Sequence, residues 1–302
     1  MSLLNNDRKV LFATLAALGA EIIFGFSFMF TKIALRFASP MTVIADRYIV
    51  AFLGMTVVML LTKTKIKFKK GMWKLVLMAV FQPLLYFIFE SYGIEMTTSA
   101  FSSVMISLIP IVSMICGIFV LKEIPTLAQY LFALLSVGGV ILMTVNQTAD
   151  GVVTPLGIVL LAGAVVSSVG YNIASRKISS EFSVFERTYA MMAIGLVSFA
   201  AIAIIENINN LSAIILPFKE PMFITSMLYL GIMSSVVAFL LLNYANTHLP
   251  VAKTTVFASI TTVVSVAAGV FFLKEPFSPE AAVSVLMIII GVVGVQKSGS
   301  GF

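Results

Sequence analysis

Long apolar runs separated by short polar connections divide this chain into ten segments. The runs lie near residues 10–35, 41–62, 72–94, 97–121, 127–146, 154–174, 184–205, 222–245, 250–273 and 280–296. A bilayer core about 30 Å thick needs roughly 20 apolar residues per spanning helix, so each run is long enough, or nearly so, to cross a membrane. The runs also lack the alternating pattern of transmembrane strands. The pattern therefore predicts an all-α membrane protein with ten transmembrane helices.

Composition and charge support this prediction and orient the helices. Of the 302 residues, 60% are hydrophobic and 11% are charged, whereas an average soluble domain is about 25% charged. If the N-terminus lies inside and the spans alternate, 14 of the 19 Lys and Arg residues fall on the inner side and 4 on the outer side. Inner loops of membrane proteins collect Lys and Arg. Both termini are therefore predicted to be cytoplasmic, and the net charge of +6 is assigned to topology rather than to nucleic-acid binding.

A short charged phrase occurs twice, as FVLKEIPT at Phe119–Thr126 and as FFLKEPFS at Phe271–Ser278. In this register of 152 residues, Tyr92–Glu123 and Tyr244–Glu275 are identical at 11 of 32 positions without a gap. A long internal period indicates duplication of a large unit. Each unit would hold five spans, and an odd number of crossings inverts the second copy in the membrane. The sequence thus predicts two inverted five-helix repeats, residues 1–147 and 154–297, and a short tail, 298–302, that an expression vector could have added.

These motifs resemble the drug/metabolite transporter superfamily, in its ten-span EamA-like branch, over nearly the whole chain. The matching stretches are Phe24–Phe28 with Lys32, Met41–Ala51 with Arg47, Gly93–Pro110, and the two Leu-Lys-Glu phrases with Gln129, Gly139 and Gly291. Phe24 stands where the family usually has Trp, and Phe132 and Ser284 stand where the helix often has Gly. The resemblance implies a multi-pass secondary transporter of the cytoplasmic membrane, often an exporter of amino acids, other metabolites or drugs.

Carboxyl groups inside the predicted spans are the first candidates for function, because burying an ionisable group costs about 2.5–3.5 kcal/mol on insertion scales. Glu21 lies near the middle of the first span and suits a proton-binding carboxylate, or else only a hydrogen bond to a neighbouring helix. Gln82, Tyr86 and Glu90 recur every four residues and share one helix face, which should line a cavity. The other interpretation of Glu90 is an interfacial carboxylate.

Lys32 lies near the outer end of the first span, where it would pair with Glu90 or hold a substrate carboxylate. Snorkelling to the headgroups is the alternative. Arg47, next to Asp46, is expected to form an interfacial ion pair.

Four further residues complete the set of substrate-binding or proton-binding candidates. They are Phe28, Tyr171, Asn172 and Asn243. Tyr171 and Asn172 of the sixth span take places near those of Phe28 and Met29 or Lys32 in the first, and Asn243 ends the eighth span. Each could coordinate substrate or only form a hydrogen bond across helices.

Glu123 and Glu275 end the fourth and ninth spans and are expected to cap the next helix, or else to gate one face each.

The sequence contains no phosphate-binding loop, no metal-ligand cluster and no catalytic triad, and it has one His and one Cys. We therefore predict neither an enzyme nor a cofactor or metal. The expected activity is export of small metabolites, such as amino acids, or of drug-like compounds by alternating access, with protons exchanged at Glu21 or Glu90. An uncoupled facilitator or exchanger and a non-transporting receptor or assembly protein are the alternatives. The expected partners are a small-molecule substrate and the lipid bilayer, and the oligomeric state is left open.

Overall fold

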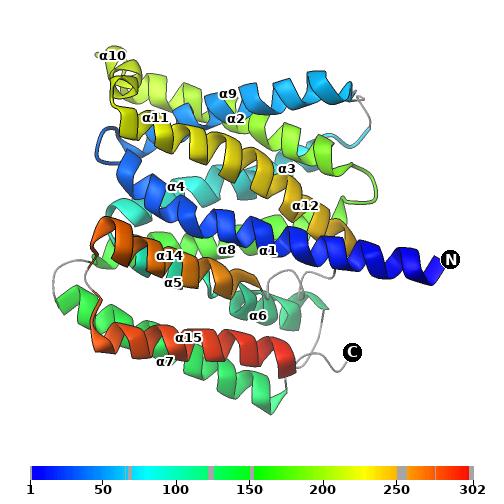
Figure 1. The fold of residues 1–302 in the computed structure, drawn as a ribbon, viewed down its shortest axis with the longest axis vertical. Coiled ribbons are helices and arrows are strands. Elements are labelled where there is room, and N and C mark those ends of the chain that lie inside the picture. The colour runs from blue at the N-terminus through cyan, green and yellow to red at the C-terminus, as the bar shows by residue number, and fades with distance from the viewer. Residues whose placement is uncertain are drawn as a thin grey trace.

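A computed structural model describes residues 2–64, 66, 70–121, 126–149, 153–249, 257–275 and 277–298 (Figure 1). Over these residues the secondary structure is helical and contains no strand. The first half holds α1 (Ser2–Ala34), α2 (Pro40–Thr62), α3 (Trp73–Ala79), η1 (Val80–Leu85), α4 (Tyr86–Glu95), α5 (Ser99–Ile106), α6 (Ile109–Leu121) and α7 (Leu127–Ala149). The second half holds α8 (Pro155–Lys177), α9 (Val184–Glu206), α10 (Ser212–Ile215), η2 (Leu216–Lys219), α11 (Pro221–Leu228), η3 (Tyr229–Val237), α12 (Ala238–His248), α14 (Ala258–Leu273) and α15 (Pro279–Ser298).

Six helices among the described residues are long and apolar enough to cross a membrane. They are Lys9–Ala34, Pro40–Thr62, Trp73–Glu95, Pro155–Lys177, Val184–Glu206 and Pro221–His248. Four shorter apolar helices accompany them, Ser99–Ser113, Leu127–Met143, Ile260–Leu273 and Pro279–Val295. The prediction of an all-helical protein is confirmed. The count of ten spans, the cytoplasmic termini and the repeat boundaries stay predictions, and residues 299–302 of the predicted tail lie outside the described residues.

Local sequence signals fix where the helices begin. Ser39 caps α2 and Ser183 caps α9, each followed by a helix of 23 residues. The Ser39 side chain accepts a hydrogen bond from the backbone N–H of Thr42, and Ser183 forms a reciprocal capping box with Glu186. The two caps are 144 residues apart, so α2 and α9 are equivalent helices of the two halves.

Each half also has a π-helical segment in its third long helix. In the first half it is η1, where Pro83 lacks a backbone N–H and Gln82 has the non-helical angles φ −148° and ψ 118°. In the second half it is η3, and both segments interrupt otherwise α-helical spans. Such bulges shift the side chains that follow them relative to a regular helix, and they often lie at functional sites.

The pairing of α7 with α15 shows how the halves are related. An added Cβ on Gly139 would lie 2.8 Å from the backbone oxygen of Ser284, and one on Gly291 would lie 2.6 Å from the backbone oxygen of Phe132. Gly291 and Ser284 follow Gly139 and Phe132 by 152 residues each, so this is one contact made twice with the halves exchanged. Along the contact, α7 and α15 run antiparallel. Two copies of a helix that pack antiparallel are related by a two-fold axis across them, as in inverted repeats.

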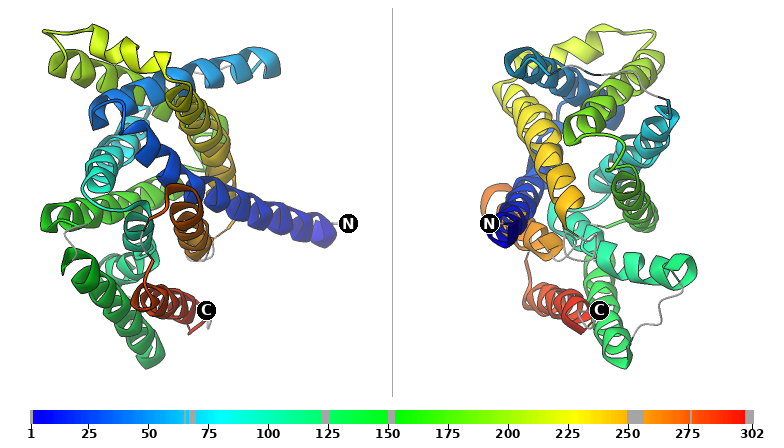
Figure 2. Two further views of the ribbon diagram at one scale, coloured as in Figure 1. Left: turned by 60° about the vertical axis from the view of Figure 1, so that its left-hand side comes forward. Right: turned by 90° about the vertical axis from the view of Figure 1, so that its right-hand side faces the viewer.

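Other helix pairs follow the same exchange. Helix α1 packs against α12 and α14, while its counterpart α8 packs against α4 and α5, and α2 packs against its counterpart α9. In Figure 1 the α7–α15 pair lies at one end of the molecule and α2 and α9 lie toward the other, with the remaining long helices between them. Figure 2 shows the same layering from two further sides. The middle layer therefore brings residues from both halves to one place.

Candidate functional site

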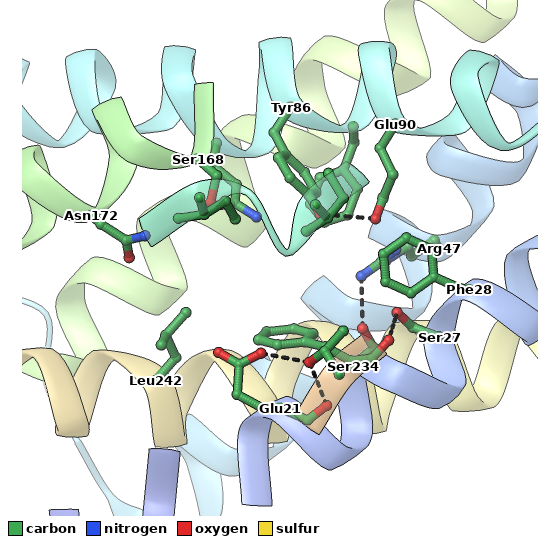
Figure 3. A pocket seen from close by; sticks show the side chains of 16 residues that line it. Glu21, Ser27, Phe28, Arg47, Tyr86, Glu90, Ser168, Asn172, Ser234 and Leu242 are labelled. Carbon is green, nitrogen blue, oxygen red and sulfur yellow. Dashed lines mark hydrogen bonds between the residues drawn. The ribbon is translucent and has the colours of Figure 1, made fainter. Parts of the chain in front are cut away.

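A cavity lies in this middle layer between the two halves. It holds about 690 Å³ of empty space, including the part at its open side. Its lining consists of Glu21, Phe24, Ser27 and Phe28 of α1, Arg47 of α2, Gln82 of η1, Tyr86, Phe87 and Glu90 of α4, Ile106 of α5, Ile109 of α6, Ser168 and Asn172 of α8, Ser234 of η3, Leu242 of α12 and Thr261 of α14. Figure 3 shows polar side chains entering it from both sides.

Much of this lining consists of repeat-related pairs. Gln82 and Ser234, Glu90 and Leu242, and Ile109 and Thr261 are each 152 residues apart, and Phe24 and Ser168, and Phe28 and Asn172, are each 144 apart. A space lined by both members of so many pairs lies on the axis that relates the halves. The two members of each pair occupy corresponding backbone positions, but their side chains differ chemically. The backbone around the cavity is therefore nearly symmetric, whereas the side chains that line it are not.

The polar face predicted on the third span lines the cavity, with Gln82, Tyr86 and Glu90 all contributing. Tyr86 Oη donates a hydrogen bond of 2.9 Å to Glu90 Oε1. Glu90 is 4% exposed, and the structure places it deep in the bundle rather than at a helix end. Glu90 and Arg47 both line the cavity, so a Glu90 carboxylate and the Arg47 guanidinium would provide opposite charges there (Figure 3).

Arg47 is the cationic group of the cavity lining. Its Nε donates a hydrogen bond of 2.7 Å to Ser235 Oγ, and its Nη2 donates one of 3.0 Å to Ser234 Oγ. Its guanidinium lies 4.2 Å from the centre of the Phe87 ring. The expected interfacial ion pair with Asp46 is therefore wrong, because Arg47 is buried and bonded to η3 of the other half. Asp46 is buried too, and neither of its carboxylate oxygens has a hydrogen-bond partner within the described part of the chain.

Glu21 enters the cavity from α1, opposite the third span (Figure 3). The side chain is half-buried, and its Oε2 lies 2.6 Å from Thr261 Oγ1 of α14. Phe28 and Asn172 also line the cavity, and Asn172 accepts a hydrogen bond of 3.3 Å from Asn246. The structure thus brings six of the nine substrate-binding or proton-binding candidates to one space, although their roles there stay predictions.

Lys32 lies outside this space and caps a helix. Its Nζ donates to the backbone oxygens of Ile94 at 2.7 Å and Glu95 at 3.4 Å, and to that of Thr97. In the second half, Arg176 follows Lys32 by 144 residues, and its Nη1 donates to the backbone oxygens of Asn246 at 2.7 Å and Thr247 at 2.8 Å. These carbonyls follow those of Ile94 and Glu95 by 152 residues. The two cations therefore make equivalent bonds to backbone carbonyls at the ends of α4 and α12.

Lys32→Ala and Arg176→Ala are each expected to lower the free energy of unfolding by about 1.5–3 kcal/mol, because each removes charged hydrogen bonds to helix-end carbonyls. Thermal unfolding of the purified protein measures the effect. Arg36→Ala, which removes an exposed cation close to Lys32, is the matched control and should change little. Equal stabilities of the Lys32 and Arg36 variants would contradict this capping role.

Tyr171 and Asn243 also lie away from the cavity, in a buried polar network. Asn243 Oδ1 accepts two hydrogen bonds, one of 3.0 Å from Tyr171 Oη and one of 2.8 Å from Ser175 Oγ. Arg187 joins the network by donating to Ser175 Oγ at 2.7 Å and to the backbone oxygen of Asn243 at 3.1 Å. Since each of these groups bonds to its neighbours, the network ties α8, α9 and α12 together.

Glu275 caps the start of α5 in the other half, and not α15, the next helix along the chain, which it was expected to cap. Its carboxylate accepts hydrogen bonds from Ser99 N at 2.8 Å, Ser99 Oγ at 2.9 Å and Ala100 N at 3.1 Å. The bonds join the end of α14 to the other half and stabilise the positive end of a helix. Its sequence counterpart Glu123 lies outside the described residues.

Sequence reasoning did not single out four polar residues of the lining, Ser27, Ser168, Ser234 and Thr261. The repeat offered a signal for one of them, since Ser234 is the counterpart of the candidate Gln82. Thr261 is the counterpart of apolar Ile109, so no pattern marked it.

The family comparison agrees with this architecture. The EamA-like transporter family matches residues 11–145 and, a second time, residues 155–296. This chain belongs to the EamA-like transporter family. Membership of the EamA-like family makes it a membrane transport protein, and the two matches confirm a two-repeat architecture.

Two relatives that this chain matches over most of their length carry transporter names. "Uncharacterized transporter YcxC" of Bacillus subtilis (strain 168) is 35% identical over 286 residues, which are 93% of this chain and 92% of the relative. An "Uncharacterized transporter" of Archaeoglobus fulgidus (strain ATCC 49558 / DSM 4304 / JCM 9628 / NBRC 100126 / VC-16) is 24% identical over 268 residues, 89% of this chain and 92% of the relative. A solved structure described as "Crystal structure of protein" has a TM-score of 0.67 at 17% identity, covering 94% of this chain and 98% of that one. That last likeness concerns the fold alone.

Proposed function

We propose that this EamA-like protein exports small metabolites, such as amino acids, or drug-like compounds across the cytoplasmic membrane by alternating access. The observation that carries the proposal is the charged cavity on the axis between the halves, with Glu21, Arg47 and Glu90 in its lining. Ionisable side chains are expensive in a bilayer and typically mark a substrate or ion pathway. A cavity of this kind suits a small polar compound that must be shielded from lipid.

The relation between the halves supports the transport mechanism. We place ten spans in two inverted repeats, residues 1–147 and 154–297, with both termini in the cytoplasm. Because inverted halves have similar backbones, they can exchange roles, so that rocking of one against the other opens the same cavity to either face. The antiparallel α7–α15 contact supports this arrangement, since it repeats with the halves exchanged.

We further propose that protons drive this export through Glu21 or Glu90. Both carboxyl groups line the cavity, and each is within hydrogen-bond distance of one hydroxyl group, Thr261 for Glu21 and Tyr86 for Glu90. A carboxyl group in this setting can take up a proton on one side of the membrane and release it on the other as the cavity changes side.

Flux into proteoliposomes of the purified protein tests the transport proposal. The vesicles carry a pH gradient and a mixed pool of amino acids and cationic dyes. Movement of a compound that stops when the gradient collapses supports proton-coupled transport. Movement that ignores the gradient supports an uncoupled facilitator, and no movement of any compound leads next to tests of a receptor or assembly role.

Glu21→Gln and Glu90→Gln are each expected to abolish gradient-driven flux, because an amide cannot carry the proton. Elution from a size-exclusion column reports whether the variants fold. Glu95→Gln is the matched control, since its side chain is exposed at the end of α4 and outside the cavity lining, and should keep normal flux. Normal flux in both single variants and in the double variant would refute the role of these two carboxyl groups.

A further inference from the structure

The Thr261 hydroxyl lies within hydrogen-bond distance of two oxygen atoms of Glu21, but it has only one hydrogen to donate. Thr261 Oγ1 lies 2.6 Å from Glu21 Oε2 and 2.7 Å from the backbone oxygen of Glu21. A threonine hydroxyl has a single hydrogen to donate, and a backbone oxygen has none. Both distances are as short as a full O–H···O bond, which is commonly about 2.7–2.8 Å long. Two full bonds therefore require a second hydrogen.

The hydrogen-bond roles at this contact follow from that count. Since the backbone oxygen of Glu21 can only accept, the Thr261 hydroxyl must donate to it. The bond between Thr261 Oγ1 and Glu21 Oε2 then needs its hydrogen from Glu21. We propose that in this conformation Glu21 is a carboxylic acid that donates from Oε2 to Thr261 Oγ1, and that Thr261 is the positioning residue that holds this proton. The inference deepens the proposed function, on which it rests for the proton's role in transport.

Close helix packing keeps the two groups together. One turn beyond Glu21, an added Cβ on Gly25 would lie 2.6 Å from Val264 Cβ and 3.0 Å from the backbone oxygen of Thr261. The absence of a side chain at Gly25 thus lets α1 approach the backbone of α14. Here a helix of the first half meets a helix of the second half, so the proton lies at a junction between halves.

A neighbouring face of α14 is bonded to α5. Thr262 Oγ1 donates 3.4 Å to the backbone oxygen of Ser103, and Ser265 Oγ donates 3.2 Å to that of Ser99. Together with the cap of Glu275 on α5, these bonds fix α14 independently of Glu21. A change in the Glu21–Thr261 bond therefore acts on α1 against a held α14.

Loss of the proton would weaken this junction. The proton passes to water in the cavity, and the Thr261 hydrogen then has two acceptors, the Glu21 carboxylate and the Glu21 backbone oxygen, but can make only one full bond. The charged and titratable side chains that line the same cavity are Arg47 of α2 and Tyr86 and Glu90 of α4, whereas the lining from α5, α6, α8, η3, α12 and α14 is uncharged. Within the described part of the chain, a Glu21 carboxylate would thus have the single Thr261 hydrogen, shared with its own backbone oxygen, as its only bond to α14. Protonation of Glu21 favours α1 held on α14, and deprotonation favours their separation.

Infrared spectroscopy of the full-length protein in vesicles at neutral pH tests this inference without any substrate. The Glu21 acid gives a carbonyl stretching band that is identified by its loss in Glu21→Gln, and the Glu90→Gln background removes the overlapping carboxyl group. We expect the band in the wild type and in Thr261→Ser, which keeps a hydroxyl. In Thr261→Val the band should shift to higher wavenumber or lose intensity, because the acid has lost its acceptor.

Thr262→Val is the matched control, since it makes the same change at the neighbouring buried threonine, whose bond goes to Ser103, and it should leave the band in place. The inference is overturned if the wild type shows no Glu21 acid band, or if Thr261→Val leaves that band unchanged. The outcome is separable from that of the flux experiment. If the protein moves no compound but shows the expected band, Glu21 carries the proton and the transport proposal is refuted. If the protein transports a compound but shows no band, only the present inference is refuted.

Discussion

Arg47→Gln is expected to lower flux at least about tenfold for whichever compound the wild type moves. A hydrogen bond to a charged group is worth about 1.5–3 kcal/mol, and about 1.4 kcal/mol corresponds to a factor of ten. The change removes the cation of the cavity lining, its bonds to Ser234 and Ser235, and the charge that faces Glu90. Proteoliposome flux measures the effect, and thermal unfolding shows whether the variant is still folded.

Two further variants separate charge from geometry at this position. Arg47→Lys keeps a positive charge but cannot reach both serine hydroxyls with a rigid fork of donors, so its flux should lie between wild type and Arg47→Gln. Ser234→Ala removes one neutral partner and should have the smallest effect. If Arg47→Gln transports as well as the wild type, Arg47 has no part in substrate recognition.

Gly291→Ala is expected to destabilise the protein by about 1–3 kcal/mol, the usual cost of overpacking a tight contact. The new Cβ would lie 2.6 Å from the backbone oxygen of Phe132 and 2.7 Å from the backbone nitrogen of Ser136. Backbone atoms cannot rotate aside as a side chain can, so α7 and α15 must separate. The free energy of unfolding, or the midpoint of thermal unfolding, reports the loss.

The chain offers matched controls for this prediction. Gly139→Ala places its Cβ 2.8 Å from the backbone oxygen of Ser284 and should cost about as much as Gly291→Ala, because the two contacts are exchanged copies. Gly138→Ala makes the same change one residue away, where the nearest atom is the flexible end of Met287 at 3.5 Å, and should be nearly neutral. Equal effects at positions 138 and 291 would show that the close approach of α7 and α15 is not what requires glycine.

Features that depend on the bilayer and on the duplication could be predicted from the sequence. The apolar runs give the helices because lipid offers no partner for a free backbone group. The register of 152 residues alone pairs Gly139 with Gly291, and the two residues make exchanged copies of one contact. The regular spacing of Gln82, Tyr86 and Glu90 likewise placed one helix face toward a cavity.

Features that depend on distant partners could not be predicted. Arg47 follows Asp46 directly, and this local context suggested an ion pair, yet its partners are serines 187 and 188 residues further along the chain. Lys32 was expected to bind a carboxylate, but it caps carbonyls exposed by the end of α4. Carboxylates, hydroxyl groups and backbone carbonyls can all accept a hydrogen bond from one cation. The tertiary packing, and not the adjacent residues in the sequence, decides which of these acceptors the cation binds.

The equivalent bonds of Lys32 and Arg176 have a consequence for how the two copies have diverged. At these positions both halves have kept a cation that tethers the first helix of the half to the end of its third. In the cavity, by contrast, Glu90 corresponds to Leu242 and Phe28 to Asn172. Within this one chain, the scaffold positions have stayed interchangeable while the lining positions have become individual. An engineer could therefore change lining positions such as Glu90 and Leu242 while leaving both tethering cations in place, because the tethers lie outside the cavity lining.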